Sequence, residues 1–425
     1  MAPGPSTATA PARQTLQQLG RRVCEAATQL RKSPPHLRHD ALLVAADELE
    51  ASAHDVLAAN RRDLESAERD GIGATAIDRL RLTEGRLGQM ADSLRDVAAL
   101  PDPVGEVVDG WVRPNGLRVE RTRVPLGVVG IIYENRPNVT SDAAALCLRS
   151  GNAAFLRGSS SALESNRAIV SLLRRALAKV GLPEDAVLLV EDTRRETVVE
   201  FMRLRGLIDC LVPRGGPSLI RTLVEQATVP YVLDGDGNCH VYIDAHADLD
   251  MATDIVVNSK TQRPGVCNAA ESLLVHRDVA QVALPRLADA LGGVELVGDD
   301  RARALVPGMG VADDEAFGKE YLDLKMSVAV VDDLDAAIAH IARHGSGHSE
   351  AIVTTDLATA ERFAREVDAA AVVVNASTRF VDGGELGLGA EVGISTQKLH
   401  ARGPMGLREL TCVKWVVRGD GQVRT

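Results

Sequence analysis

The segment NSKTQRPGVCNAAESLLVH, residues 258–276, places a single cysteine, Cys267, on a turn between a helix-like stretch and an apolar, strand-like run. A Pro-Gly pair precedes it, and these residue types let a backbone present a side chain at the tip of a loop. A cysteine attacks as its thiolate, which nearby cations favour, and Lys260 and Arg263 are close in sequence. The pattern predicts a nucleophilic cysteine, although scattered cysteines are more often small buried hydrophobes.

The other cysteines lie mostly in patterns that favour burial. Cys147 falls among Ala and Leu in a helical pattern, and Cys210 falls inside an apolar strand. Cys239, in GNCHVYID, is the closest competitor of Cys267, because it begins a strand and could face either the core or a cleft. No CxxC pair occurs, which argues against a zinc site. The few scattered cysteines fit reduced thiols in the cytoplasm rather than a disulfide framework.

Two strand-to-helix junctions carry residue types suited to phosphate. The segments LVPRGGPSLIR and FLRGSSS contain Arg214, Gly215, Gly216 and Ser218, and Arg157 and Ser159, respectively. The free N–H groups and the dipole at the start of a helix attract anions. Ordinary strand-to-helix punctuation accounts for both segments equally well, and no GxGxxG lies between a strand and a helix.

A run of histidines, in HIARHGSGHSEA, raises the question of a metal. His340, His344 and His348 are four positions apart, so on one continuous helix they would share a face. Gly345 and Gly347 interrupt that helix before His348, and no carboxylate or cysteine completes a set at ligand spacing. We therefore expect a polar loop and no metal site.

Composition excludes several classes of protein. The 425 residues carry a net charge of −11, which argues against a nucleic-acid surface. No apolar run approaches the roughly 20 residues that span a bilayer. The first residues, MAPGPSTATAPARQ, lack the apolar core of a secretory signal, so a frayed tail and a cytoplasmic protein are expected. The length suggests two or three domains.

The elements that must position these residues follow from periodicity. Residues 14–100 show helical spacing, and residues 111–127 look like an extended ribbon with a Pro-Asn-Gly turn. Short apolar runs then alternate with helix-length segments, which is typical of a parallel sheet covered on both faces and binding ligands at the carboxyl ends of its strands. A second α/β series begins near residue 248. The first series has expected strands at 127–133, 153–157, 186–191, 207–212 and 230–234.

Six ordered segments resemble the aldehyde dehydrogenase superfamily. They are YENRPNVTSDAAALCLRSGN, VPRGG, GNCHVYID, NSKTQRPGVCNAAE, HIARHGSGHSEAI and FVDGGELGLGAEVGISTQKLHARGPMGL. Together they span the chain from about residue 125 to the C-terminus. Within the superfamily, the chain is similar to the branch that reduces L-glutamyl 5-phosphate in proline biosynthesis.

The resemblance implies an α/β fold of the aldehyde dehydrogenase type in three parts. Residues 1–108 with 125–246 would form a Rossmann-like NADPH-binding domain, and residues 247–407 an α/β catalytic domain. Residues 109–124 with 408–425 would form a β-ribbon that joins copies of the chain into a homo-oligomer.

It also implies an activity. NADPH would reduce L-glutamyl 5-phosphate to L-glutamate 5-semialdehyde, with release of phosphate, through a thioester on Cys267. A small-molecule substrate, no nucleic-acid or membrane partner and a cytoplasmic location accompany this activity, and contact with the upstream enzyme, glutamate 5-kinase, is left open. The alternative is a hydrolytic or acylating NAD(P)-dependent semialdehyde dehydrogenase that acts on another substrate.

One departure from relatives speaks against hydrolysis. Hydrolytic members carry a glutamate in an ELGG-like stretch, which activates the water that cleaves the thioester. The corresponding stretch here is LDGDGN, with Asp234 and Asp236. A reductase that starts from an acyl phosphate should avoid hydrolysing its intermediate, so the missing glutamate favours the reductase.

The resemblance assigns roles around the thioester. The backbone N–H of Cys267 and the side-chain amide of Asn138 would hold the oxyanion, with Asn135 as the alternative, since the alignment does not decide between them. Arg157 and Ser159 sit where relatives hold the adenosine ribose, so they would meet the 2′-phosphate of NADPH.

Three cations are candidates for binding the substrate's phosphate and α-carboxylate, because guanidinium and ammonium groups suit such anions. They are Arg136, Arg263 and Lys398. Which cation meets which anion is left open.

Overall fold

The computed structural model describes residues 14–233 and 235–424, and the chain divides into two compact units. The first unit holds the residues up to 231 together with those from 413 onward, and the second holds 232–412. The expected boundary between the cofactor and catalytic domains was 246/247. The units divide earlier because strand β7 (Cys239–Ile243) pairs within the sheet of the second unit.

The N-terminal part of the first unit is helical, as expected. The first helix begins at a capping box, in which the side chain of Thr15 accepts from the backbone of Gln18 and the side chain of Gln18 accepts from the backbone of Thr15. Its apolar face, with Leu16, Val23 and Leu30, is buried. The helices are α1 (Leu16–Leu30), α2 (Pro35–Ala51), α3 (Ala53–Arg69), α4 (Ala74–Leu80) and α5 (Glu84–Ala99).

The first unit also contains a parallel sheet in the order β5-β4-β3-β6. Every residue of β3 and β4 is buried, as a sheet covered on both faces requires. The strands are β3 (Val128–Tyr133), β4 (Ala153–Arg157), β5 (Val187–Leu189) and β6 (Cys210–Arg214), and the helices are α6 (Pro137–Arg149), α7 (Leu163–Lys179), α8 (Arg195–Met202) and α9 (Pro217–Gln226). The strand expected at 230–234 is reduced to one isolated bridge between Leu211 and Tyr231, and Asp234 lies outside the described residues.

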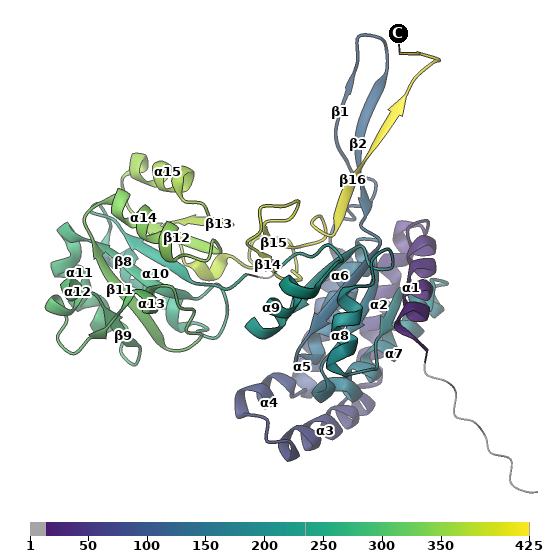
Figure 1. The fold of residues 1–425 in the computed structure, drawn as a ribbon, viewed down its shortest axis with the longest axis horizontal. Helices are drawn as coiled ribbons and strands as arrows, with labels where there is room; N and C mark the ends of the chain where they lie inside the picture. The colour runs from purple at the N-terminus through teal and green to yellow at the C-terminus, as the bar shows by residue number, and fades with distance from the viewer. Residues whose placement is uncertain (1–13, 234, 425) are drawn as a thin grey trace, which may run out of the picture. The chain divides into compact units, whose positions relative to one another are not determined.

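The extended ribbon is present, formed by strands from both ends of the chain. β1 (Val107–Val112) pairs antiparallel with β2 (Arg118–Pro125), and β2 lies between β1 and β16 (Thr411–Arg418), as Figure 1 shows. The turn between β1 and β2 includes Gly116, whose φ of 87° is accessible to glycine at little cost.

The second unit is built on a parallel sheet in the order β10-β9-β11-β8-β7-β12-β13. Alternate strand residues face two separate cores. Val241 and Ile243 pack with α10 and α11, whereas Tyr242 packs with α14 and α15. This arrangement confirms the expected α/β class with covered parallel sheets.

Most elements of the second unit match the expected alternation of strands and helices. The stretch 295–317 was not anticipated, because its strands and helices are too short to show a clear period. The elements are α10 (Leu249–Thr261), β8 (Ala270–His276), α11 (Arg277–Ala290), β9 (Glu295–Gly298), α12 (Asp300–Leu305), β10 (Gly310–Val311), α13 (Asp314–Phe317), β11 (Lys325–Val331), α14 (Leu334–His344), β12 (Ser349–Val353), α15 (Leu357–Glu366), β13 (Ala371–Val374), β14 (Ile394–Ser395) and β15 (Gly403–Pro404).

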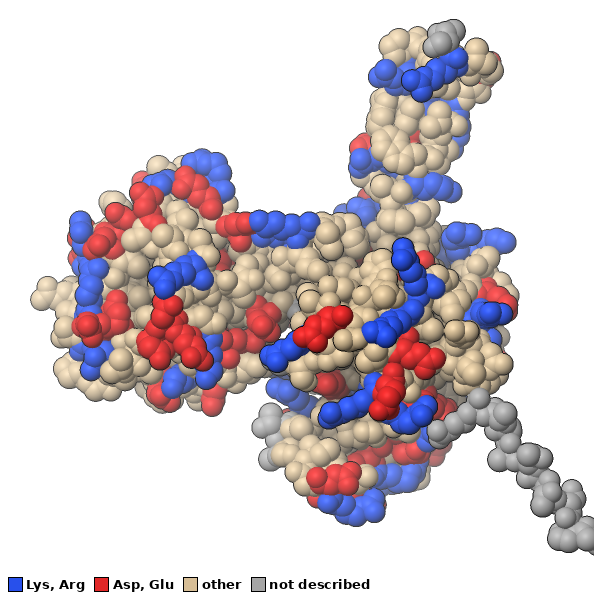
Figure 2. All heavy atoms as spheres, viewed as in Figure 1, with Lys and Arg blue, Asp and Glu red and all other residues tan. Residues whose placement is uncertain are grey.

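The surface carries charges of both signs. Figure 2 shows acidic and basic side chains interspersed over the visible face of both units, without one large basic area. Within the described ranges, no helix has the length and apolar character needed to cross a membrane.

Candidate active site

Cys267 lies in the second unit, on the loop 262–269 that joins α10 to β8. Its side chain is partly exposed, as a nucleophile must be. A buried ion pair closes the base of this loop: the Nζ of Lys260 lies 2.7 Å from Oε2 of Glu271, and both side chains are inaccessible to solvent. Burial raises the pKa of Glu271 to about 7, and the charge of Lys260 opposes that rise.

The backbone of Cys267 is held by two residues that precede or begin β7. The Sγ of Cys239 donates to the carbonyl oxygen of Cys267 over 3.1 Å. Gly237 approaches so closely that a Cβ at this position would lie 1.7 Å from the same oxygen. Cys239 is fully buried and its pKa is raised well above the ordinary value by desolvation, so it is a thiol donor and a poor nucleophile.

A buried polar layer lies next to Cys239. His348 is in contact with the Sγ of Cys239 at 3.7 Å and with the hydroxyl of Ser349 at 2.8 Å. His240 and Glu350 form a buried pair at 2.9 Å. The histidine run therefore divides between the end of α14 and this layer, and no group of three or more His, Cys, Asp or Glu side chains suited to a metal occurs in the described part of the chain.

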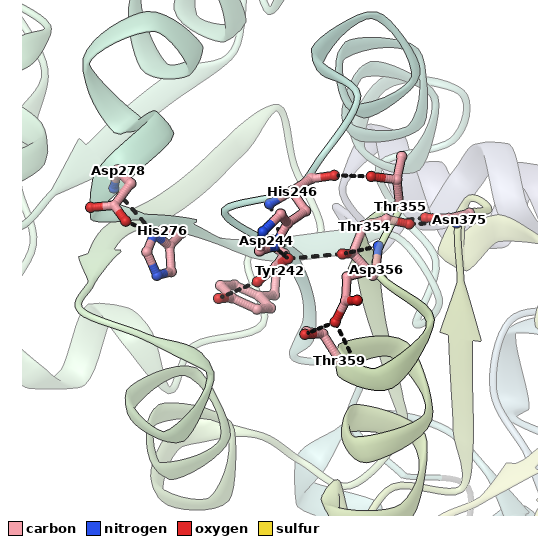
Figure 3. A network of polar contacts seen from close by, with 10 residues as sticks. All are labelled: Tyr242, Asp244, His246, His276, Asp278, Thr354, Thr355, Asp356, Thr359 and Asn375. Atoms are coloured by element: carbon pink, nitrogen blue, oxygen red, sulfur yellow. Dashed lines mark hydrogen bonds and ion pairs between the residues drawn. The ribbon is translucent and has the colours of Figure 1, made fainter.

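A second polar network lies at the opposite end of the strands, where β7 and β12 finish (Figure 3). At the carboxyl end of β7, Asp244 accepts from the hydroxyls of Tyr242 (3.2 Å) and Thr354 (2.8 Å). Asp356 caps α15. These carboxylates serve turns and caps. Cys267 instead precedes the first residue of β8, so the usual location of ligands at carboxyl ends does not apply to this cysteine.

The three predicted substrate cations have different surroundings. Arg263 is exposed on the Cys267 loop. Lys398 forms an ion pair with Asp368, which also pairs with Arg402 at 2.8 Å, so its charge is already balanced at the surface. Arg136, in the first unit, is the N-cap residue of α6 and is partly buried.

Arg379 was not among the predicted site residues, and it contacts the start of the Cys267 loop. Its Nε donates to Oε1 of Gln262 over 2.8 Å. Burial lowers the pKa of its guanidinium and the neighbouring Arg263 lowers it further, whereas Asp382, Cys267 and Glu385 act in the opposite direction. The available signal was an arginine between the apolar strand AVVVNAS and the glycine-rich segment that begins at Phe380.

In the first unit, the two candidate oxyanion asparagines are held differently. Asn135 has a φ of 46°. Its amide oxygen accepts from the hydroxyls of Ser159 (3.2 Å) and Ser161. Asn138 is exposed, and its Nδ2 donates to Asp142 over 3.0 Å. Burial raises the pKa of Asp142 to about 6, with the hydrogen bond from Asn138 opposing the rise.

Arg157 and Ser159 follow β4, as predicted, but both already have protein partners. Arg157 is buried and donates to the carbonyl oxygens of Thr193 (2.8 Å) and Arg194 (3.3 Å). Its Nε is buried with no hydrogen-bond partner among the described residues. Ser159 forms hydrogen bonds with Asn135, so it links the loop after β4 to the loop after β3.

The helix start predicted to hold phosphate is occupied by a side chain of the protein. The backbone N–H of Gly216, the N-cap residue of α9, donates to Oε2 of Glu134 over 3.0 Å. A Cβ on Gly215 would lie 2.7 Å from the same carboxylate oxygen. Arg214 ends β6 and Ser218 is exposed. A carboxylate therefore takes the place expected for phosphate, at an end of a helix that favours negative charge.

This combination of α/β units and a cysteine on a fixed loop agrees with the profile of the aldehyde dehydrogenase family, which matches residues 12–309. The chain belongs to this family.

Its relatives are more specific. It is 55% identical over 411 residues to a gamma-glutamyl phosphate reductase of Moorella thermoacetica, covering 96% of this chain and 98% of the relative. It is 53% identical over 411 residues to the enzyme of that name from Thermobifida fusca, with the same coverage of both chains. The crystal structure of gamma-glutamyl phosphate reductase from Thermotoga maritima superposes with a TM-score of 0.95 at 47% identity, covering 97% of this chain and 100% of that one.

A more distant structure shares the fold alone. The acetylating aldehyde dehydrogenase of Geobacillus thermoglucosidasius gives a TM-score of 0.68 at 17% identity, covering 96% of this chain and 97% of that one.

Proposed function

We propose that the chain reduces L-glutamyl 5-phosphate to L-glutamate 5-semialdehyde with release of phosphate, a step of proline biosynthesis. The function is the one that the names of its relatives describe. The observation that carries it in this chain is Cys267, partly exposed on a loop whose base and backbone are both fixed.

The first chemical step uses residues of the chain alone. The thiolate of Cys267 forms a bond to the acyl carbon, and the bond from that carbon to the phosphate oxygen breaks, so phosphate leaves with the electron pair. Both thioester formation and its reduction pass through an oxyanion, which a backbone N–H and a side-chain amide stabilise by about 3 kcal/mol each. We assign the Cys267 N–H as one donor.

For the second donor, we propose Asn135 rather than Asn138. The hydroxyls of Ser159 and Ser161 fix the amide oxygen of Asn135, which orients its Nδ2 and leaves that group available. The Nδ2 of Asn138 instead donates to Asp142. Asn138 thus supports the start of α6, and Asn135 is the better oxyanion donor.

A nicotinamide dinucleotide, when bound, supplies the hydride that reduces the thioester. The carboxyl edge of the first unit's sheet fits such a group in part: Arg157 presents a buried Nε without a partner, and Gly215 and Ser218 are exposed there. Glu134 accepts from the N–H of Gly216, so one donor at the start of α9 is already engaged in this structure. We propose NADPH as the cofactor. In this proposal Arg157 positions the 193–194 loop, to whose carbonyl oxygens it donates, beside the cofactor.

The cellular setting is proposed from composition and surface. None of the cysteines in the described chain forms a disulfide, which suits the reducing cytoplasm. We propose a homo-oligomer formed through the ribbon of β1, β2 and β16. The substrate is a small molecule, and we propose contact with the upstream enzyme, glutamate 5-kinase.

The reverse reaction tests this function. NADP⁺ reduction by glutamate 5-semialdehyde should require inorganic phosphate, because phosphate must cleave the thioester by attack on its carbonyl carbon. NADPH formation without phosphate would mean that water resolves the thioester, and a requirement for a thiol such as coenzyme A would mean an acylating enzyme. A Cys267→Ala variant should lose activity in every case.

A further inference from the structure

We infer that Arg263 and Arg379 form a phosphate-binding site beside Cys267, which holds the phosphate of the acyl phosphate as it leaves. The inference rests on the proposed function and adds to it the residues that recognise the leaving group. Arg379 is the new member of this site, and the inference assigns the phosphate, rather than the α-carboxylate, to Arg263.

The loop that carries Arg379 is fastened to both ends of the Cys267 loop. Before the cysteine, Ser259 contacts Ser377 at 3.0 Å between hydroxyl oxygens and accepts from the N–H of Thr378 over 3.3 Å. After it, the Nδ2 of Asn268 donates to the carbonyl oxygen of Val381 over 2.9 Å.

Arg379 lies between these two anchors, in a short 3₁₀ turn (Thr378–Phe380) capped by Ser377. Its Nε is bonded to Gln262, at the end of α10. The guanidinium is therefore fixed through its Nε, and its two terminal nitrogens carry the remaining four N–H donors.

Arg263 and Arg379 are neighbouring cations, and the carboxylates of Asp382 and Glu385 act on Arg379 only from beyond ion-pair distance. Among the residues that the structure describes, neither Arg263 nor Arg379 makes an ion pair within 4 Å, unlike Lys398 and Arg402, which share Asp368. Asp382, whose charge raises the pKa of Arg379, also accepts from the backbone N–H groups of Gly384 and Glu385 in its own turn. Two neighbouring guanidiniums repel each other unless an anion lies between them.

The chemistry selects phosphate as that anion. In glutamyl phosphate, the phosphate oxygen is bonded to the carbon that Cys267 attacks, whereas the α-carboxylate is at the other end of the carbon chain. Cations beside the cysteine therefore meet the phosphate first. As the carbon–oxygen bond breaks, negative charge grows on the phosphate, and planar guanidiniums bind it bidentately. The same charges favour the attacking thiolate.

Steady-state kinetics of the reverse reaction test the assignment. Arg379→Gln should raise the KM for inorganic phosphate roughly 10- to 100-fold, the loss expected for one charged hydrogen-bonding group, with little change in the KM for the semialdehyde. Arg379→Lys should recover part of the loss. Arg365→Gln is the matched control, because Arg365 is exposed in the same unit and contacts only Glu366 in its one ion pair, at 3.6 Å. A rise in the semialdehyde KM alone would assign the pair to the α-carboxylate and overturn the inference.

A second readout does not require activity. The rate of Cys267 alkylation, followed by mass spectrometry, is compared for anionic iodoacetate and neutral iodoacetamide, with glutathione in the same solution as the reference thiol. Arg263→Gln, an exposed substitution, and Arg379→Gln should each lower the iodoacetate-to-iodoacetamide ratio. Inorganic phosphate should protect the wild type and not the variants. Equal ratios and equal protection in all proteins would overturn the site.

These measurements separate the inference from the function on which it rests. If the wild type needs no phosphate, the proposed function fails, and the phosphate assignment fails with it. If the wild type needs phosphate but its KM is unchanged in both arginine variants, the function stands and the site is wrong.

Discussion

The backbone carbonyl of Cys267 is confined from two sides. On one side the backbone of Gly237 packs so closely that there is no room for a side chain. On another side the thiol of Cys239 donates a hydrogen bond to the carbonyl oxygen of Cys267. Because the N–H of Cys267 is our proposed oxyanion donor, any displacement of this backbone moves both the sulfur and the donor. Catalysis is sensitive to shifts of about 1 Å in such groups.

Gly237→Ala should therefore lower kcat by at least about 100-fold. The added Cβ would overlap the Cys267 carbonyl oxygen and push the loop outward. Gly265→Ala is the control, because a Cβ there meets its nearest atom, the Leu322 carbonyl oxygen, only at 3.8 Å. Activity assays with a parallel thermal unfolding curve separate a displaced loop from an unfolded protein, and equal kcat for both variants would contradict this account.

At the scale of elements, the nucleophile depends on the unit formed by α10, its loop and β8. Lys260 on α10 and Glu271 on β8 form an inaccessible ion pair that spans the loop. Such pairs fix geometry more than they stabilise, since the cost of burying two charges offsets much of their attraction. Removing one partner leaves the other buried and unpaired.

Single and double substitutions of this pair should affect the free energy of unfolding differently. Lys260→Met or Glu271→Leu alone should lower the free energy of unfolding by about 3–5 kcal/mol, whereas the double variant should lie near the wild type or above it. Urea unfolding measures all four proteins. If the double variant retains stability but loses activity, the pair serves the geometry of the loop.

The same pair gives a dependence on pH. Burial raises the pKa of Glu271 to about 7, above its ordinary value of 4.5. The folded state then holds a proton that the unfolded state has lost, so between these values this group makes the protein less stable as pH rises. The slope should be absent from the double variant, which has no titrating group at this position.

At the scale of the whole molecule, the ribbon exposes apolar side chains. Trp111 and Trp415 form an edge-to-face pair at 5.6 Å between ring centroids, and both are substantially exposed. Val112 and Val417 are more than half exposed on β1 and β16, which are the outer strands of this sheet. Figure 2 shows an uncharged area in the middle of the visible face of the ribbon, with basic side chains toward its tip and sides. Exposed apolar strands of this kind are suited to association with another copy.

Val417→Glu should consequently reduce the size of the assembly. A charge placed on an apolar interface must be desolvated without a partner, which weakens association. Light scattering after size exclusion measures the mass, and far-ultraviolet circular dichroism checks that both units remain folded. Val423→Glu is a control at an exposed position beyond β16. An unchanged mass for Val417→Glu would exclude the ribbon as the principal interface.

Much of the molecule was determined by the sequence alone. The apolar runs of β3 and β4, the helical N-terminal part and the alternation of the second unit all follow from local periodicity, because a segment's burial pattern is written in its own residues. The turn with Pro-Gly and nearby cations predicted Cys267 as the nucleophile, with Cys239 as its competitor. The ordered motifs were enough to predict the family that the comparisons then showed.

Only the tertiary structure decided which distant segments meet. The fully buried pattern of β7 would suit a strand in the sheet of either unit. Only its pairing with β8 and β12 places it in the second unit. Glu134 contacts the start of α9, and Arg379 contacts the start of the Cys267 loop, although both residues are far from these elements in the sequence. Periodicity reports whether a residue is buried, but it contains no information on which buried or charged partner the rest of the chain brings to it.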